Sequence, residues 1–226
     1  MSNFVLVHGA WYGGWCWAQV AQRLRDAGHE VFTPTLSGLG EQAGPGAEMI
    51  DLRTHAVDVT NVLLEHDLED VVLVGHSYGG LVVREVADSL SGRIKELILV
   101  DAWAGGDGES LDSLAPAFFK AWVDSATSEG LIAVPPASSV GVVDPEQAAW
   151  IEERLRPQPR LTFSQPTRLN GAVEDIPCRA IVCTPGGPMP FAELAKAFGW
   201  PTTEIASGHD VMTLAPDELA EMLLKP

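Results

Sequence analysis

A serine and a histidine, far apart in the sequence, could together perform nucleophilic catalysis. Ser77 lies in the pentapeptide Gly75–Gly79, which reads GHSYG and fits the G-x-S-x-G pattern of a nucleophile elbow. An apolar run precedes this pentapeptide and a helical pattern follows it. We therefore expect Ser77 on a tight, strained turn that lifts its hydroxyl above the edge of a sheet. The alternative is an incidental serine in a Gly-rich turn.

The matching base is expected near the end of the chain, because such sites order nucleophile, acid and histidine along the sequence. Of the six histidines, His209 is the one that follows the last predicted strand. We predict that its imidazole accepts the Ser77 proton. The alternative is an exposed loop histidine.

An oxyanion hole requires two converging N–H donors. The backbone of Tyr78, directly after the nucleophile, is predicted to supply one, and the Ala10 N–H in the loop after the first strand the other. Gly9, Trp11 and Trp103 are predicted to contact substrate. The alternatives are a plain tight turn at Gly9 and core packing for the two tryptophans.

The elements around these residues alternate between short β-branched runs and helical patterns. Strands are predicted at 4–7, 29–33, 70–75, 94–100, 180–183 and 203–206, with helices at 17–27, 51–64, 78–90, 191–198 and 216–224 and a loop at 35–50. Asp51 is expected to cap its helix. This alternation predicts a mostly parallel sheet of about six strands with helices on both faces.

Residues 104–175 break this alternation. They show helical pieces at 114–123 and 145–155, joined by Pro- and Gly-rich links, and no convincing strand. We interpret this stretch as a helical cap inserted after the strand that ends at Asp101. The whole chain, 1–226, is predicted to form one domain, with its core at 1–103 and 176–226.

The composition excludes some partners. Among 226 residues, acidic side chains outnumber basic ones 31 to 14, a formal charge of −17, which repels nucleic acid and anionic membranes. The three cysteines lack metal-ligand or redox spacing. We expect no metal and no cofactor. The N-terminus has no signal-peptide pattern and no run reaches the length of a membrane span, so we expect a cytoplasmic protein.

Four segments carry a resemblance to a known family: FVLVHGAWYGGWCW from Phe4, PTLSGLGE from Pro34, VVLVGHSYGG from Val71 and GHDVMTLAP from Gly208. They resemble the α/β-hydrolase superfamily, and within it the branch of small bacterial esterases, plant methyl-ester esterases and plant hydroxynitrile lyases. The resemblance implies the α/β-hydrolase fold and a Ser-His-acid hydrolase without cofactor or metal.

Two positions help to choose within that branch. The lyases carry a threonine where this chain has Gly9, and a lysine after the histidine where this chain has Asp210. The lysine charge suits cyanide release, whereas Asp210 has the opposite charge. Both differences favour hydrolysis.

The catalytic acid is where this chain departs from the family it resembles. Many members place an acidic residue in the loop that here is 184–190, but this loop contains no Asp or Glu. Asp101, at a strand end used by some superfamily members, is our choice, since a carboxylate there could orient His209. Asp101 could instead bond only loop backbone, which would leave a Ser-His dyad. Asp210 adjoins His209, but consecutive side chains usually point apart. Glu193, Asp175 and Asp107 are less suitable.

The predicted reaction is cleavage of a carboxylic ester, lactone or thioester of a small to medium apolar or aromatic substrate, through an acyl-enzyme on Ser77. The alternatives are a non-hydrolytic enzyme of the same fold (a lyase, a cofactor-free oxygenase or a biosynthetic cyclase) and a small-molecule receptor. The sequence leaves the oligomeric state open, a homodimer included.

Overall fold

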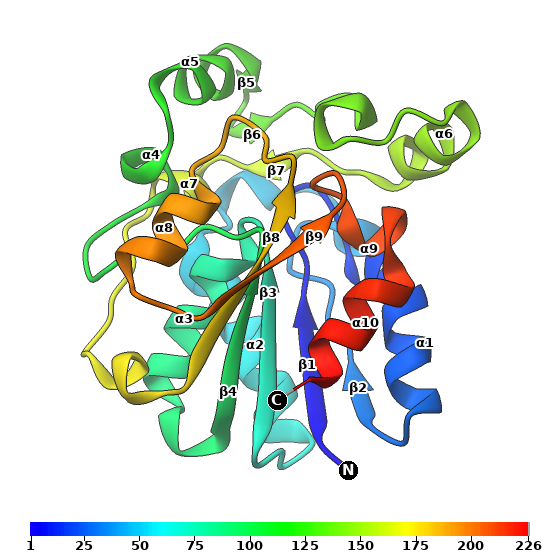
Figure 1. The fold of residues 1–226 in the computed structure, drawn as a ribbon. Helices are drawn as coiled ribbons and strands as arrows, with labels where there is room; N and C mark the ends of the chain where they lie inside the picture. Colours follow the sequence, from blue (N-terminus) through cyan, green and yellow to red (C-terminus); the bar gives the residue numbers. More distant parts are fainter. Residues whose placement is uncertain (226) are drawn as a thin grey trace.

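The computed structural model describes residues 1–225, apart from the side chain of Gln42, and is organised around one parallel sheet. Its strands are β1 Asn3–Val7, β2 Glu30–Phe32, β3 Val71–His76, β4 Ile94–Val100, β8 Cys178–Thr184 and β9 Thr202–Ala206. They lie in the order β2-β1-β3-β4-β8-β9, and every neighbouring pair is parallel. The six predicted strands are therefore confirmed. Their carboxyl ends share one edge, at the top of Figure 1.

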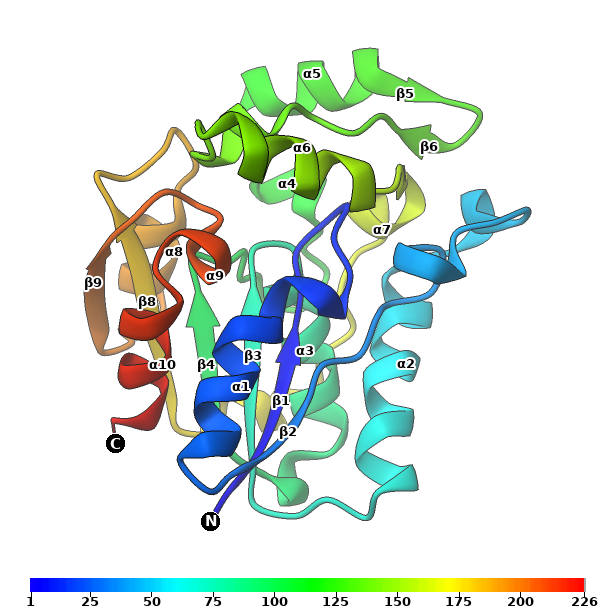
Figure 2. The same cartoon turned by 90° about the vertical axis from the view of Figure 1, so that its right-hand side faces the viewer.

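Helices cover both faces of this sheet (Figures 1 and 2), because alternate strand residues face opposite ways and both sets are apolar. One face packs against α2 Leu52–Glu65, α3 Gly79–Ser89 and α8 Phe191–Ala197, and the other against α1 Ala18–Asp26, α9 Val211–Leu214 and α10 Pro216–Leu224. The predicted cap of α2 is confirmed, since the Asp51 carboxylate accepts from the Thr54 N–H at 2.8 Å.

Several short helical turns were not predicted. The 3-10 turns are η1 Gly14–Trp17, η2 Gly40–Gln42, η3 Ala47–Met49, η4 Ser91–Arg93, η5 Ala137–Val140 and η6 Ala172–Asp175. Two of them lie in the stretch expected to be a loop. Within residues 1–225, none of the helices combines the length and the apolar character needed to cross a membrane.

Most of residues 104–175 lie over the carboxyl edge of the sheet, and the last part of the stretch runs down beside α3 (Figure 1). They form α4 Leu111–Leu114, α5 Ala117–Ala126, α6 Pro145–Arg154 and α7 Leu161–Ser164, together with the strands β5 Thr127–Ser128, β6 Leu131–Ile132 and β7 Gln158–Pro159. The expectation of helical pieces alone was wrong, because β5-β6-β7 is a small antiparallel sheet. The sequence could not predict these strands, because two residues are too few to show an alternating pattern. Their pairing is also non-local, since Ile132 pairs with Gln158.

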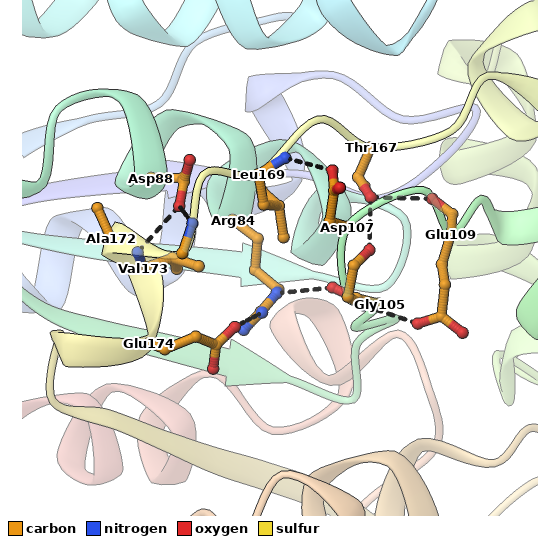
Figure 3. A network of polar contacts seen from close by, with 12 residues as sticks. Arg84, Asp88, Gly105, Asp107, Glu109, Thr167, Leu169, Ala172, Val173 and Glu174 are labelled. Carbon is orange, nitrogen blue, oxygen red and sulfur yellow. Dashed lines mark hydrogen bonds and ion pairs between the residues drawn. The ribbon is translucent and has the colours of Figure 1, made fainter.

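Both ends of this insertion are attached to α3, the helix that follows Ser77 (Figure 3). Arg84 on α3 is 1% exposed; its Nε donates to the Gly105 carbonyl at 3.1 Å and its Nη2 contacts Glu174 at 2.5 Å. The Phe198 ring lies 4.6 Å below the guanidinium carbon. A buried charge is tolerated only when it is paired and hydrogen-bonded in this way.

Asp88, one turn further along α3, holds the segment that returns from the insertion to the sheet. Its carboxylate accepts three backbone N–H bonds, from Asn170 at 2.6 Å, Gly171 at 3.0 Å and Val173 at 3.1 Å. The returning segment also pairs with the outgoing one, since the Thr167 N–H donates to the Glu109 carbonyl at 2.8 Å. The insertion is thus tied to the core at its base.

Replacing Asp88 tests this attachment. In the wild type both Asp88 oxygens accept backbone N–H groups. In Asp88→Asn the amide NH₂ replaces one of these oxygens and leaves a backbone N–H without an acceptor. We therefore expect the free energy of unfolding to fall by about 2–3 kcal/mol. Asp175→Asn is the matched control, because Asp175 is exposed. Urea unfolding of both variants measures the difference, and equal stability would contradict the proposed attachment.

Candidate active site

Ser77 occupies the turn between β3 and α3 in a strained conformation. Its φ is +51°, in the left-handed region that non-glycine residues rarely adopt. Backbone hydrogen bonds maintain it: the Ser77 N–H donates to the Val100 carbonyl at 3.2 Å, and its carbonyl accepts from the Trp103 N–H at 3.0 Å. The Ser77 side chain lines a cavity at the carboxyl edge of the sheet.

Two glycines allow this turn to sit close to its neighbours. A Cβ at Gly79 would lie 2.7 Å from the His8 carbonyl oxygen, so a side chain there would force the helix away from β1. A Cβ at Gly9 would lie 2.9 Å from the Ser77 Cβ and 3.0 Å from Nδ1 of His76. Gly9 lines the same cavity, and because it has no side chain, Ser77 can occupy its observed position.

His209 and Asp101 meet across the sheet edge. His209 follows β9, and its Nδ1–H donates to Oδ2 of Asp101 at 2.6 Å. Asp101 follows β4 with φ +43° and is 6% exposed; its other oxygen accepts from the Cys183 N–H at 3.0 Å. The Phe191 ring stacks on His209 at 5.1 Å, with 9° between the ring planes. These contacts fix the orientation of the imidazole.

The hydrogen bond at Nδ1 also determines the tautomer. Because the carboxylate accepts there, the neutral ring keeps its lone pair on Nε2, where a proton can be received. His209 and Ser77 line the same cavity. Within residues 1–225 the Ser77 hydroxyl makes no hydrogen bond to the His209 ring, a contact that often tightens only when substrate is bound.

Asp210 points away from the neighbouring imidazole, as consecutive side chains usually do. Its Oδ2 accepts from the Tyr12 hydroxyl at 3.1 Å, and burial raises the pKa of its carboxyl. His76 supports the same loop, because its Nε2–H donates to the His209 carbonyl at 2.9 Å. Burial, and then the proximity of His209, lower the pKa of His76 well below its usual value, so this ring stays neutral.

The backbone N–H groups of Ala10 and Tyr78 were predicted to form an oxyanion hole. Both residues line the cavity, and neither N–H donates to a protein acceptor within residues 1–225. The Tyr78 side chain is turned away, with its hydroxyl 2.9 Å from Nδ1 of His55. Burial lowers the pKa of His55 to about 4, so this ring is neutral and Nδ1 can accept that bond. The Tyr78 hydroxyl is therefore engaged by His55, and the prediction for Tyr78 concerns its backbone N–H alone.

The cavity has a volume of about 720 Å³, and several aromatic side chains line it. Trp11 and Trp103, both predicted to contact substrate, line it. Their aromatic neighbours on the walls come from the core and from the insertion: Tyr12, Phe118, Phe119, Trp122, Phe163 and Phe191. A cavity of this size and character suits a small to medium apolar molecule.

Sequence reasoning missed three residues around this site. Phe191 stacks on His209, His76 holds the His209 carbonyl, and Gln158 contacts the backbone of the Ala10–Trp11 loop. Phe191 and Gln158 lie in segments without a catalytic pattern. His76 could have been noticed, because it immediately precedes Ser77.

The chain is similar to known proteins along its whole length. The profile of the Alpha/beta hydrolase family matches residues 4–222. A carbendazim hydrolyzing esterase of Nocardioides sp. (strain SG-4G) is 38% identical over 99% of this chain and 98% of its own. Methyl jasmonate esterase 1 of Vitis vinifera is 32% identical over 50% of this chain and 43% of its own.

A solved structure shows the same fold. It is an extracellular alpha/beta-hydrolase from a Paenibacillus species, described as sharing structural and functional homology with tobacco salicylic acid binding protein 2. The TM-score is 0.89 at 24% identity, over 99% of this chain and 98% of the other.

Gly9→Ala tests the close approach at Ser77. A methyl group 2.9 Å from the Ser77 Cβ must displace the serine or its own loop, so we expect kcat/KM for a p-nitrophenyl ester to fall about 10- to 100-fold. Gly92→Ala is the control, because a Cβ at Gly92 meets nothing within 4 Å. Equal rates in the two variants would contradict the expectation.

Proposed function

This chain belongs to the alpha/beta hydrolase family and is a carboxylic ester hydrolase, and we propose that it cleaves its ester through an acyl-enzyme on Ser77. His209 acts as the base and Asp101 as the acid of this triad. The observation that carries the proposal is the 2.6 Å bond between His209 Nδ1 and Asp101, beside the strained Ser77 turn and in the same cavity.

The first half of the reaction forms the acyl-enzyme. Nε2 of His209 takes the Ser77 proton while Oγ attacks the ester carbonyl, and the N–H groups of Ala10 and Tyr78 stabilise the oxyanion. The intermediate collapses with cleavage of the ester C–O bond. The imidazolium returns its proton to the departing alcohol oxygen, while the carboxylate of Asp101 stabilises the positive ring until this transfer.

The second half releases the acid. Water enters, His209 removes a proton from it, and the resulting hydroxide attacks the acyl carbon at the same oxyanion hole. Collapse of this intermediate breaks the bond to Ser77 Oγ, which recovers its proton from the imidazolium. The products are one carboxylic acid and one alcohol, and the enzyme returns to its starting state.

We propose that the substrate is an ester of a small alcohol with an apolar or aromatic acyl group. The aromatic side chains that line the cavity, which include Trp11 and Trp103, and the volume of about 720 Å³ support this class. The similarity to a methyl jasmonate esterase favours a methyl group as the alcohol part.

The insertion 104–175 acts in this proposal as a cap on a core of 1–103 and 176–226. It supplies Phe119, Trp122 and Phe163 to the cavity wall, and apolar side chains beside the oxyanion reduce its contact with water. The cytoplasm is the proposed compartment, which suits the free thiols of Cys16, Cys178 and Cys183.

Ser77→Ala tests the nucleophile. We expect the variant to lose labelling by a fluorophosphonate probe and to lose on the order of 10⁴-fold or more in kcat, because no other group can form the acyl-enzyme. The substrates are p-nitrophenyl esters of increasing acyl length, methyl jasmonate and carbendazim. Ser89→Ala, at the far end of α3, should label and turn over like the wild type. Labelling of Ser77→Ala would disprove the assignment.

Asp101→Asn, compared with Asp210→Asn, tests the acid. In Asp101→Asn the amide oxygen stays on the Cys183 N–H, so the NH₂ group faces His209. The ring must then accept at Nδ1 and carry its proton on Nε2, which cannot take the Ser77 proton.

For Asp101→Asn we expect kcat to fall about 10³- to 10⁴-fold. Asp210→Asn keeps an acceptor for Tyr12 and should stay within about tenfold of the wild type. The reverse order of effects in steady-state kinetics would assign the acid to Asp210.

A further inference from the structure

Trp11, beside the Ala10 oxyanion donor, has a backbone conformation that its own side chain disfavours. Its φ is +68°, which is uncommon for a bulky residue. The loop after β1 rises toward the insertion (Figure 2), and the insertion binds Trp11 at both backbone groups. The Trp11 N–H donates to Oε1 of Gln158 at 2.9 Å, and the Trp11 carbonyl accepts from the Arg156 N–H at 3.0 Å.

Gln158 is suited to hold this loop in one position. It lies on β7, is fully buried and does not belong to the cavity wall. Its amide nitrogen donates to Oγ1 of Thr162 at 2.8 Å, and that hydroxyl donates to the Pro159 carbonyl at 2.6 Å. The amide is therefore anchored at its nitrogen, which leaves its oxygen directed at Trp11.

We propose that Gln158 is a positioning residue of the oxyanion hole, through which the insertion sets the orientation of the Ala10–Trp11 peptide. This inference rests on the proposed function, in which the Ala10 N–H binds the oxyanion. The Trp11 N–H and the Ala10 carbonyl belong to one rigid peptide unit. The Ala10 N–H belongs to the preceding peptide unit, which meets this one at the Ala10 Cα, so holding the Ala10–Trp11 unit restricts the movement of the Ala10 N–H relative to Ser77.

The Trp11 ring is held separately from its backbone. Its Nε1 donates to the Ile132 carbonyl at 3.3 Å, and its ring makes edge contacts with Trp122 at 5.9 Å and Phe163 at 5.8 Å. The cavity wall at Trp11 therefore stays in place when the bond to Gln158 is lost. Loss of that bond should lower stabilisation of the transition state and leave binding of the ground state nearly unchanged.

Gln158→Leu is the test, with Gln165→Leu as its matched control. Gln165 also lies in the insertion, and its Oε1 also accepts a backbone N–H from the core, that of Arg53 at 3.0 Å. It lies outside the cavity wall. Steady-state kinetics on a p-nitrophenyl ester separates kcat from KM, and thermal unfolding measures the stability of both variants.

For Gln158→Leu we expect kcat to fall about 10- to 100-fold with KM within about threefold. A misplaced N–H donor loses much of the transition-state stabilisation that a deleted donor would lose. Gln165→Leu should keep kcat within about twofold. A kcat for Gln158→Leu equal to that of Gln165→Leu, while Ser77→Ala is inactive, overturns this inference alone. Wild-type turnover in Ser77→Ala would overturn the proposed function, and this inference with it.

Gln158→Glu keeps the test decisive if the leucine variant does not fold. Burial favours the neutral carboxyl, which can accept from the Trp11 N–H through one oxygen and donate to Thr162 through the other. We expect its kcat at the wild-type pH optimum to recover to within about fivefold of the wild type. A folded glutamate variant with kcat reduced 10-fold or more would contradict the positioning role.

Discussion

Three strands of the sheet, β1, β3 and β4, lie side by side, and the chain beyond each contains a non-glycine residue with positive φ: Trp11, Ser77 and Asp101. Such conformations cost on the order of 1–3 kcal/mol each and persist only where the surroundings impose them. Here the bends turn the chain sharply at the carboxyl edge, where open α/β sheets bind ligands. The candidate site depends on these bends being maintained.

The sheet itself maintains two of the three bends. Ser77 donates its N–H to the end of β4, and Asp101 donates its N–H to the Ile181 carbonyl on β8 at 2.7 Å. The parallel ladder therefore continues one residue into each bend, which joins the proposed nucleophile and acid to the most buried part of the molecule. The third bend, at Trp11, is held by the insertion, so core and insertion both take part in forming the site.

The position of the acid follows from the same geometry. The loop after β8 contains no carboxylate, but the Cys183 N–H on β8 itself holds Asp101 and so directs the other carboxylate oxygen toward His209. β8 thus contributes a backbone donor that orients Asp101. Phe191 stacks on the imidazole and His76 donates to the His209 carbonyl, so both help to hold His209 in place.

The sequence alone determined the central strands and the GHSYG turn, because buried parallel strands are apolar throughout and their ends are marked by glycine and polar residues. It also predicted Ser77, His209 and Asp101 as site residues, with Asp101 chosen among alternatives. It could not reveal the β5-β6-β7 sheet or Gln158, since a two-residue strand has no period and a glutamine between prolines has no pattern. Their roles arise from contacts between residues more than 20 positions apart, such as Ile132 with Gln158 and Trp11 with Gln158. Only tertiary packing decides which backbone groups lack a hydrogen-bond partner in their own element, and which distant side chain supplies that partner.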